Sequence, residues 1–122
     1  MRTHVMLENN EQDIQEIELS IEQAKATIAR RDALVRLTNN PDFKDIVNQG
    51  YFEKEASRLV LLKADYEMQD DKQQRLIDNA IIGVGSFRAY LRTIVQFGAM
   101  AENQLEQDHK THDELLSEEE GE

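Results

Sequence analysis

Apolar residues recur at alternating steps of three and four along two long stretches of the chain, with charged and polar residues between them. This spacing places the apolar side chains on one edge of an α-helix. In the first stretch, residues 11 to about 38, the edge comprises Ile14, Ile17, Ile21, Ala24 and Ile28. In the second, residues 71 to about 108, it comprises Ile77, Ala80, Val84, Phe87, Leu91, Ile94, Gly98, Ala101 and Leu105. The pattern predicts two long helices, each with a narrow apolar seam.

Between the two long helices, the sequence predicts two short ones. Residues 40–42 (Asn-Pro-Asp) form a helix start signal, with an N-cap residue, a proline at the first helical position and an acidic residue after it. The first short helix should end at Gly50, which suits a left-handed C-terminal turn. The second should run from about residue 51 to 64. Asp70 is the predicted N-cap of the final long helix.

We therefore predict an all-α fold, a bundle built on a coiled-coil-like hairpin of two long antiparallel helices with two short helices between them. The expected organisation is a flexible N-terminal arm (1–10), a helical domain (11–108) and an acidic C-terminal tail (109–122). Gly83, Gly85 and Gly98 lie in the final helix, where each costs about 1 kcal/mol relative to alanine. Close approach of another helix, or a kink near residues 83–85, would explain them.

The residues expected in the core or in an interface share the apolar seams and the aromatic central block. They are Ile14, Ile17, Ile21, Ile28, Phe43, Tyr51, Phe52, Leu59, Ile77, Val84, Phe87, Leu91, Ile94 and Leu105. One thin core in so small a chain supplies only about 3–5 kcal/mol. We therefore expect the seams to be shared between copies, which makes the chain a homo-oligomer.

The chain has 25 acidic and 14 basic residues, and its net charge is −11. Residues 101–122 hold nine of the acidic residues against one lysine, so the rest of the chain is nearly balanced. Without a basic stripe, direct binding to nucleic acid or to anionic lipid is disfavoured. No apolar run reaches the roughly 18 residues of a membrane-spanning helix. The tail is expected to be a solvated end, and docking of the tail on a basic partner stays open as the alternative.

The side chains that could carry chemistry are few. The absence of cysteine excludes disulfides, thiolate nucleophiles and cysteine-ligated zinc. His109 and His112 could point the same way on a helix, and Glu106 with His109 matches the Glu-x-x-His motif of di-iron bundles. A second such motif is missing, and a metal site needs three or four rigidly held ligands. We expect no metal, no cofactor and no enzymatic activity.

The central block and the final helix resemble a known group of proteins. The stretches are 40–47 (NPDFKDIV), 50–60 (GYFEKEASRLV), 62–65 (LKAD), 82–87 (IGVGSF), 90–91 (YL) and 113–119 (DELLSEE). Over residues 32–120 the chain is similar to small acidic helical proteins encoded by tailed bacteriophages. The resemblance implies a viral context and no catalytic residues.

From this resemblance we expect a non-enzymatic bacteriophage structural or assembly protein, associated with the head or capsid, that acts through helix–helix contacts. Its expected partners are further copies of itself and other phage structural proteins. Its expected location is the virion, or the host cytoplasm during infection. The alternative is a phage-encoded effector that binds a host protein.

Overall fold

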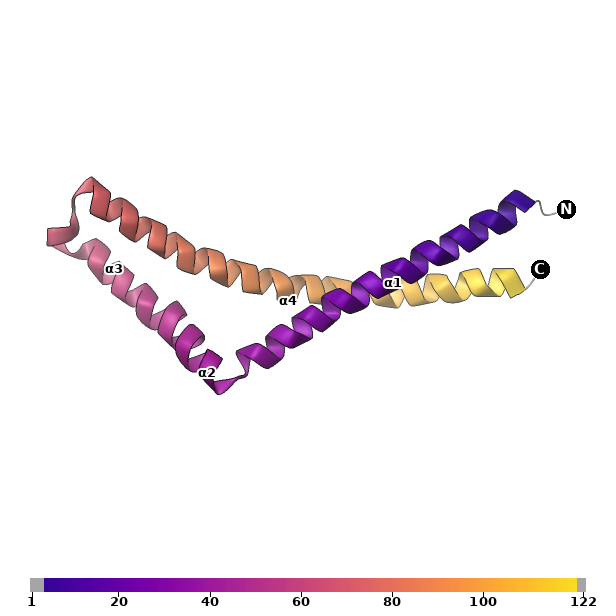
Figure 1. The fold of residues 1–122 in the computed structure, drawn as a ribbon, viewed down its shortest axis with the longest axis horizontal. Helices are drawn as coiled ribbons and strands as arrows, with labels where there is room; N and C mark the ends of the chain where they lie inside the picture. The colour runs from indigo at the N-terminus through magenta and orange to yellow at the C-terminus, as the bar shows by residue number, and fades with distance from the viewer. Residues whose placement is uncertain (1–3, 121–122) are drawn as a thin grey trace. The chain divides into compact units, whose positions relative to one another are not determined.

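The computed structural model describes residues 4–120, and their side chains from residue 9 onward, and this part of the chain contains helices and no strand. The predicted all-α fold is confirmed. The elements, in chain order, are α1 (His4–Thr38), α2 (Pro41–Phe43), the π-helix η1 (Lys44–Glu55), α3 (Ala56–Ala64), the 3₁₀ turn η2 (Tyr66–Met68) and α4 (Asp71–Glu120) (Figure 1).

Both long helices extend beyond the bounds that the apolar pattern predicted. Helix α1 begins at His4 and not near residue 11, and α4 continues to Glu120 although the apolar pattern thins after residue 108. The added residues are rich in glutamate and leucine, which extend an existing helix at little cost because nucleation has already occurred. The division into arm, helical domain and tail stays a prediction.

The segment between the long helices forms one helical run from Pro41 to Ala64, which we call the middle helix. Its predicted start is confirmed, because the Asn40 side chain accepts hydrogen bonds from the backbone N–H groups of Asp42 (2.9 Å) and Phe43 (3.3 Å). The predicted break at Gly50 is wrong. Gly50 has no positive φ, and the helix passes through it.

The middle helix continues through Gly50 in π-helical form. A π-helix pairs each N–H with the carbonyl five residues earlier, and runs of twelve residues are rare. A Cβ atom at position 50 would lie only 3.0 Å from the backbone oxygen of Asp45, so glycine suits this tight turn. In this continuous helix Leu59 is buried, and the Tyr51 ring lies against Phe87 of α4.

The chain divides into two compact units. The terminal unit comprises Met1–Asp32 and Val95–Glu122, and the central unit comprises Ala33–Ile94. In the terminal unit, the first part of α1 lies beside the last part of α4 in antiparallel direction (Figure 1). Hydrogen bonds and ion pairs across this pair join Glu18 to His112, Ser20 to Asp108 and Arg31 to Glu102.

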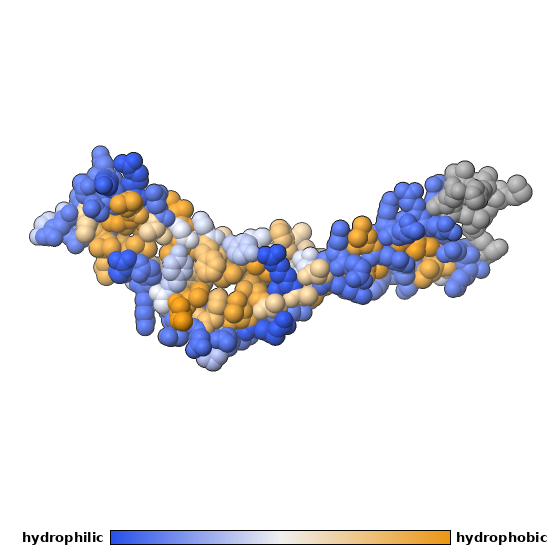
Figure 2. Space-filling model, viewed as in Figure 1, coloured by the Kyte–Doolittle hydropathy of each residue, from blue (hydrophilic) through white to orange (hydrophobic). Residues whose placement is uncertain are grey.

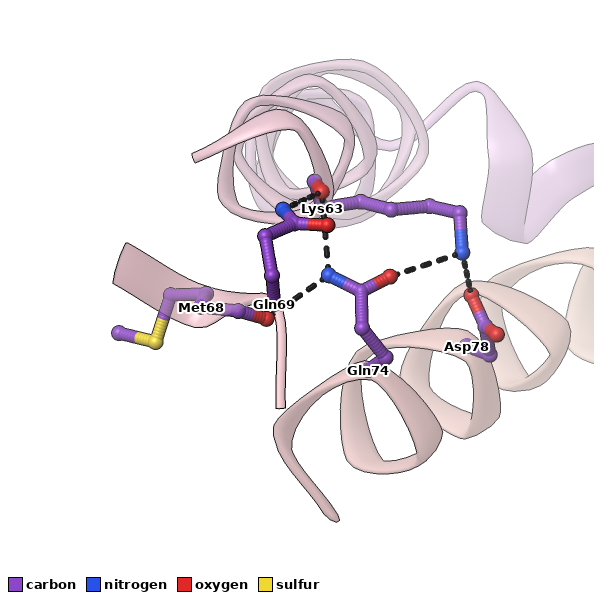
Figure 3. A network of polar contacts seen from close by, with 5 residues as sticks. All are labelled: Lys63, Met68, Gln69, Gln74 and Asp78. Carbon is purple, nitrogen blue, oxygen red and sulfur yellow. Dashed lines mark hydrogen bonds and ion pairs between the residues drawn. The ribbon is translucent and has the colours of Figure 1, made fainter. Parts of the chain in front are cut away.

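In the central unit, the middle helix and the first part of α4 form a second antiparallel pair, joined by η2. A polar network holds the turn (Figure 3). The backbone oxygen of Lys63 accepts hydrogen bonds from the side-chain amides of Gln69 (2.9 Å) and Gln74 (3.1 Å). The Lys63 ammonium pairs with Asp78, and the Gln74 amide also donates to the Met68 carbonyl. The two bonds to the Lys63 oxygen satisfy a carbonyl in the last turn of α3, where carbonyls lack partners within the helix.

The core of each unit is thin. The buried apolar side chains are Ile21, Ala24 and Ala101 in the terminal unit, and Leu34, Leu59, Ile77 and Val84 in the central unit. Among the described side chains, no large one is fully buried. Two helices packed along one edge leave most of each helix surface in solvent, and the remaining apolar side chains are therefore exposed.

Candidate interaction surface

Three aromatic rings meet where the middle helix passes α4. Tyr51 and Phe52 are neighbours on η1, with ring centroids 5.7 Å apart. Phe87 of α4 lies 6.1 Å from the Tyr51 ring, edge to face, and 5.6 Å from the Phe52 ring. Aromatic pairs in these arrangements contribute roughly 0.5–1.5 kcal/mol beyond the area that they bury. Phe87 nevertheless keeps 37% of its surface exposed, because the cluster covers it on one side only.

An apolar groove adjoins this cluster. Its volume is about 700 Å³, and it is lined by Ile46, Val47, Gly50, Tyr51, Glu55 and Phe87. Ile46, one of the lining residues, keeps 67% of its surface exposed. The groove belongs entirely to the central unit. It is large enough to admit apolar side chains from another helix.

The one charged residue that lines the groove is compensated by a neighbour. Arg58 donates hydrogen bonds to the Glu55 carboxylate through Nε (3.0 and 3.1 Å) and through an additional guanidinium N–H. These bonds hold the pKa of the Glu55 carboxyl below its ordinary value of 4.5. They also raise the pKa of the Arg58 guanidinium. The groove therefore presents an ion pair at its rim, with no net charge.

A second apolar hollow lies along the middle helix. It has a volume of about 540 Å³ and is lined by Phe52, Glu53, Ala56, Ser57, Val60 and Leu61. Val60 and Leu61 project beside it and are exposed, Leu61 by 72%. Leu59, which precedes them directly in the sequence, is buried. The middle helix thus carries more apolar surface than its contacts with α4 use.

Charge and exposed apolar surface are divided between the two units. The central unit has nine acidic and nine basic residues, whereas the terminal unit has sixteen acidic and five basic residues and carries all of the net charge of −11. The large apolar side chains that are exposed in the central unit are Val35, Leu37, Ile46, Val60, Leu61, Tyr66, Leu76, Ile82, Phe87 and Tyr90. Those in the terminal unit are Leu19, Val95, Phe97 and Met100. On the face in view in Figure 2, coloured by hydropathy, apolar residues gather over the central unit.

The structure separates the residues that resembled a metal site. His112 is half-buried and lies 3.2 Å from the Glu18 carboxylate, whereas His109 is exposed. Asp108 is hydrogen-bonded to Ser20 (2.5 Å) and to Gln104 (2.8 Å). Among the side chains that the structure describes, from residue 9 to residue 120, no group of three or more histidine, aspartate or glutamate residues is placed to hold a metal ion.

The residues expected in the core or an interface fall into three classes of burial. Ile21, Leu59, Ile77 and Val84 are buried. Ile14, Ile17, Ile28, Phe43, Tyr51, Phe52, Leu91, Ile94 and Leu105 are half-buried. Phe87 is slightly more exposed than these. The structure brings Tyr51, Phe52 and Phe87 together at the edge of the groove.

The sequence prediction missed Asp108, which is 3% exposed in the terminal unit. A signal was present, because position 108 continues the seam three residues after Leu105. A carboxylate is seldom buried without a partner, and the partner, Ser20, is 88 residues away in sequence. Spacing alone could not reveal that pair.

Comparison of the chain with protein-family models, with curated proteins and with solved structures gives no match. None of the helices in residues 4–120 is both long enough and apolar enough to cross a bilayer.

Proposed function

We propose that the chain is a non-enzymatic structural or assembly protein of a bacteriophage particle, acting through helix–helix contacts made by its central unit. The observation that carries the proposal is the combination of balanced charge and exposed apolar side chains in Ala33–Ile94. Large apolar patches on a soluble surface mark sites of protein–protein contact.

The energetics favour covering this surface. Removing apolar surface from water contributes roughly 25 cal/mol per Å², and the groove and the projecting Val60 and Leu61 offer such surface on one helix. The thin core of the central unit supplies little stability by itself. Contacts with another helix would therefore add to the stability of this unit as well as joining it to a partner.

The viral context of the proposal comes from the resemblance of residues 32–120 to small acidic proteins of tailed bacteriophages. Two of the stretches that carry this resemblance, residues 40–47 and 50–60, lie in or next to the helix that lines the groove. A particle protein that works by helix contacts needs a partner surface and no catalytic group. The groove, with its ion pair and aromatic walls, supplies a surface of this kind.

Quantitative mass spectrometry of purified phage particles tests this function. We expect the chain in a constant number of copies per particle, at a ratio to the major capsid protein that does not change between preparations. A soluble host protein measured in the same samples serves as the control for carry-over. If the chain is absent from washed particles and one host protein captures it from infected cells, the proposal is wrong and the effector alternative stands.

A further inference from the structure

The groove of the central unit indicates what it binds, given the proposed function. We propose that the groove lined by Ile46, Val47, Gly50, Tyr51, Glu55 and Phe87 binds the central unit of a second copy of this chain. Three features support this: the apolar lining of the groove, the balanced charges of the middle helix, and the exposed apolar side chains that a second copy can insert.

The groove requires an apolar and uncharged occupant. Its walls are aliphatic and aromatic, and the carboxylate of Glu55 is already paired with Arg58. A charged side chain placed in the groove would lose its hydration without gaining a partner, because the Glu55 carboxylate is already paired with Arg58. Apolar side chains on a helix carry no such cost, and they fill grooves between the ridges of another helix.

The charges of the middle helix are self-complementary. It carries four basic and four acidic residues, and opposite charges stand side by side at Lys44 and Asp45 and again at Glu53 and Lys54. All four of these side chains are exposed. A second copy can meet each sign with the opposite one, whereas a strongly acidic or strongly basic partner would meet like charge at half of the positions.

The same unit also offers the projecting apolar side chains that a groove needs. Val60 and Leu61 are 57% and 72% exposed on α3, and Ile82 is 63% exposed on α4. A second copy therefore brings both a groove and side chains to fill one. No further protein has to be invoked to cover the surface.

The terminal unit argues against association through the acidic ends of the chain. Its sixteen acidic and five basic residues repel the same unit of another copy, whereas the central unit has no net charge to oppose contact. Exposed ion pairs between two copies contribute little to affinity. Association through the central unit should therefore strengthen as salt screens the repulsion between two chains of charge −11. Binding of a basic partner would weaken under the same change.

Sedimentation velocity of the full chain over a range of concentrations tests the inference. We expect reversible self-association of the wild type and an at least tenfold higher midpoint concentration for Ile46→Asp. Leu19→Asp is the matched control, since it adds the same charge at an apolar residue of similar exposure (59% against 67%) in the terminal unit. Its midpoint should equal that of the wild type. If Ile46→Asp loses helicity by circular dichroism, Ile46→Ser and Leu19→Ser repeat the comparison.

Salt provides the second arm of the experiment. Raising the salt from about 0.01 M to about 0.15 M shortens the Debye length from roughly 30 to roughly 8 Å, and it should lower the midpoint concentration of the wild type. The inference is wrong if the wild type stays monomeric or if a higher salt concentration raises its midpoint concentration. It is also wrong if Ile46→Asp has the midpoint concentration of the wild type, or if Leu19→Asp raises the midpoint concentration as much as Ile46→Asp does. A monomeric chain that is nevertheless found in purified particles would overturn this inference and leave the proposed function standing.

Discussion

At the scale of single residues, Asp108 is the most unusual side chain of the terminal unit. It occupies a seam position of α4 between Leu105 and His112, where an apolar residue would pack against α1. Its two carboxylate oxygens accept hydrogen bonds from Ser20 and from Gln104. A single buried polar residue in a helical seam costs stability but favours one register over others. The bond from Ser20 therefore helps to set how α1 and α4 align in this unit.

Removing the hydroxyl of Ser20 should destabilise the terminal unit. Ser20→Ala leaves one oxygen of a buried carboxyl group without its donor, and leaving a buried acceptor unsatisfied costs about 1–3 kcal/mol. We expect the free energy of unfolding in urea to fall by about that amount. Ser57→Ala, at an exposed position of α3, is the control and should change it little. Equal unfolding curves for the two variants would contradict the role of this bond.

The sequence predicts single residues only in part. The three-and-four rhythm of α4 assigned Ile77, Val84 and Phe87 to the same edge, yet the first two are buried and Phe87 is exposed by 37%. The rhythm identifies the face of a helix but not how far the neighbouring helix extends over it. The neighbours of Phe87 are Tyr51 and Phe52, and their rings cover one side of it.

At the scale of elements, two glycines of α4 have opposite surroundings. A Cβ atom at position 98 would overlap the Cβ and Cγ atoms of Arg31 on α1, so the close approach expected of a helical glycine is found there. A Cβ at position 85 would meet nothing within 4 Å. The same residue type in the same helix thus reflects tight packing in one unit and open solvent in the other.

Alanine at these two positions should change stability in opposite directions. Gly85→Ala should raise the free energy of unfolding by about 0.5–1 kcal/mol, because alanine favours the helix and meets no neighbour. Gly98→Ala should lower it by about 1–3 kcal/mol despite the same helix preference, because α1 must move away. Thermal and urea unfolding of both variants measure this. A stabilised Gly98→Ala protein would contradict the close contact between α1 and α4.

The ion pair of the middle helix makes a pH-dependent contribution. The pKa of the Glu55 carboxyl is lowered by the hydrogen bonds from Arg58, so the pair stabilises the folded chain above the ordinary pKa of 4.5. That contribution is lost as the pH falls through the lowered value. NMR titration should find the pKa of Glu55 below 4.5 in the wild type and higher in Arg58→Gln than in the wild type. An unchanged pKa in the variant would show that Arg58 is not the cause.

The starts of helices were predictable from the sequence where a capping residue marks them. The caps at Asn40 and Asp70 are short-range, and both side chains accept backbone hydrogen bonds in the structure. The π-helix was not predictable from such signals. Glycine is common where an α-helix ends, so Gly50 predicted a stop. In the structure the π-helix continues through Gly50, and each backbone N–H of a π-helix pairs with the carbonyl five residues earlier. The packing of Tyr51 and Phe52 near Phe87, which is 36 and 35 positions away in sequence, supports that continuation.

At the scale of the whole molecule, the division of charge from apolar surface is the central finding. The acidic residues of 101–122 were evident in the sequence, but residues 1–32 add seven more, against four basic residues. The two segments stand at opposite ends of the chain, and only folding joins them in one acidic unit. The balanced charge of Ala33–Ile94 likewise emerges only when the structure defines its bounds.

The structure also bears on whether the apolar seams are internal. In the terminal unit, Ile21, Ala24 and Ala101 are buried within one chain, so these parts of the two seams cover each other. In the central unit, the groove and the exposed Leu61 remain uncovered. We therefore expect a second copy to add its contacts in the central unit, and the terminal unit to stay solvated.

Hydrogen exchange measured at low and at high protein concentration tests this claim most directly. If the central unit is the contact surface, raising the concentration through the association midpoint should slow exchange of the backbone amides in residues 44–64 and leave those in residues 9–32 unchanged. The second segment is an internal control, since it belongs to the same chain in the same sample. Slower exchange confined to residues 9–32, or equal slowing in both segments, would contradict the account.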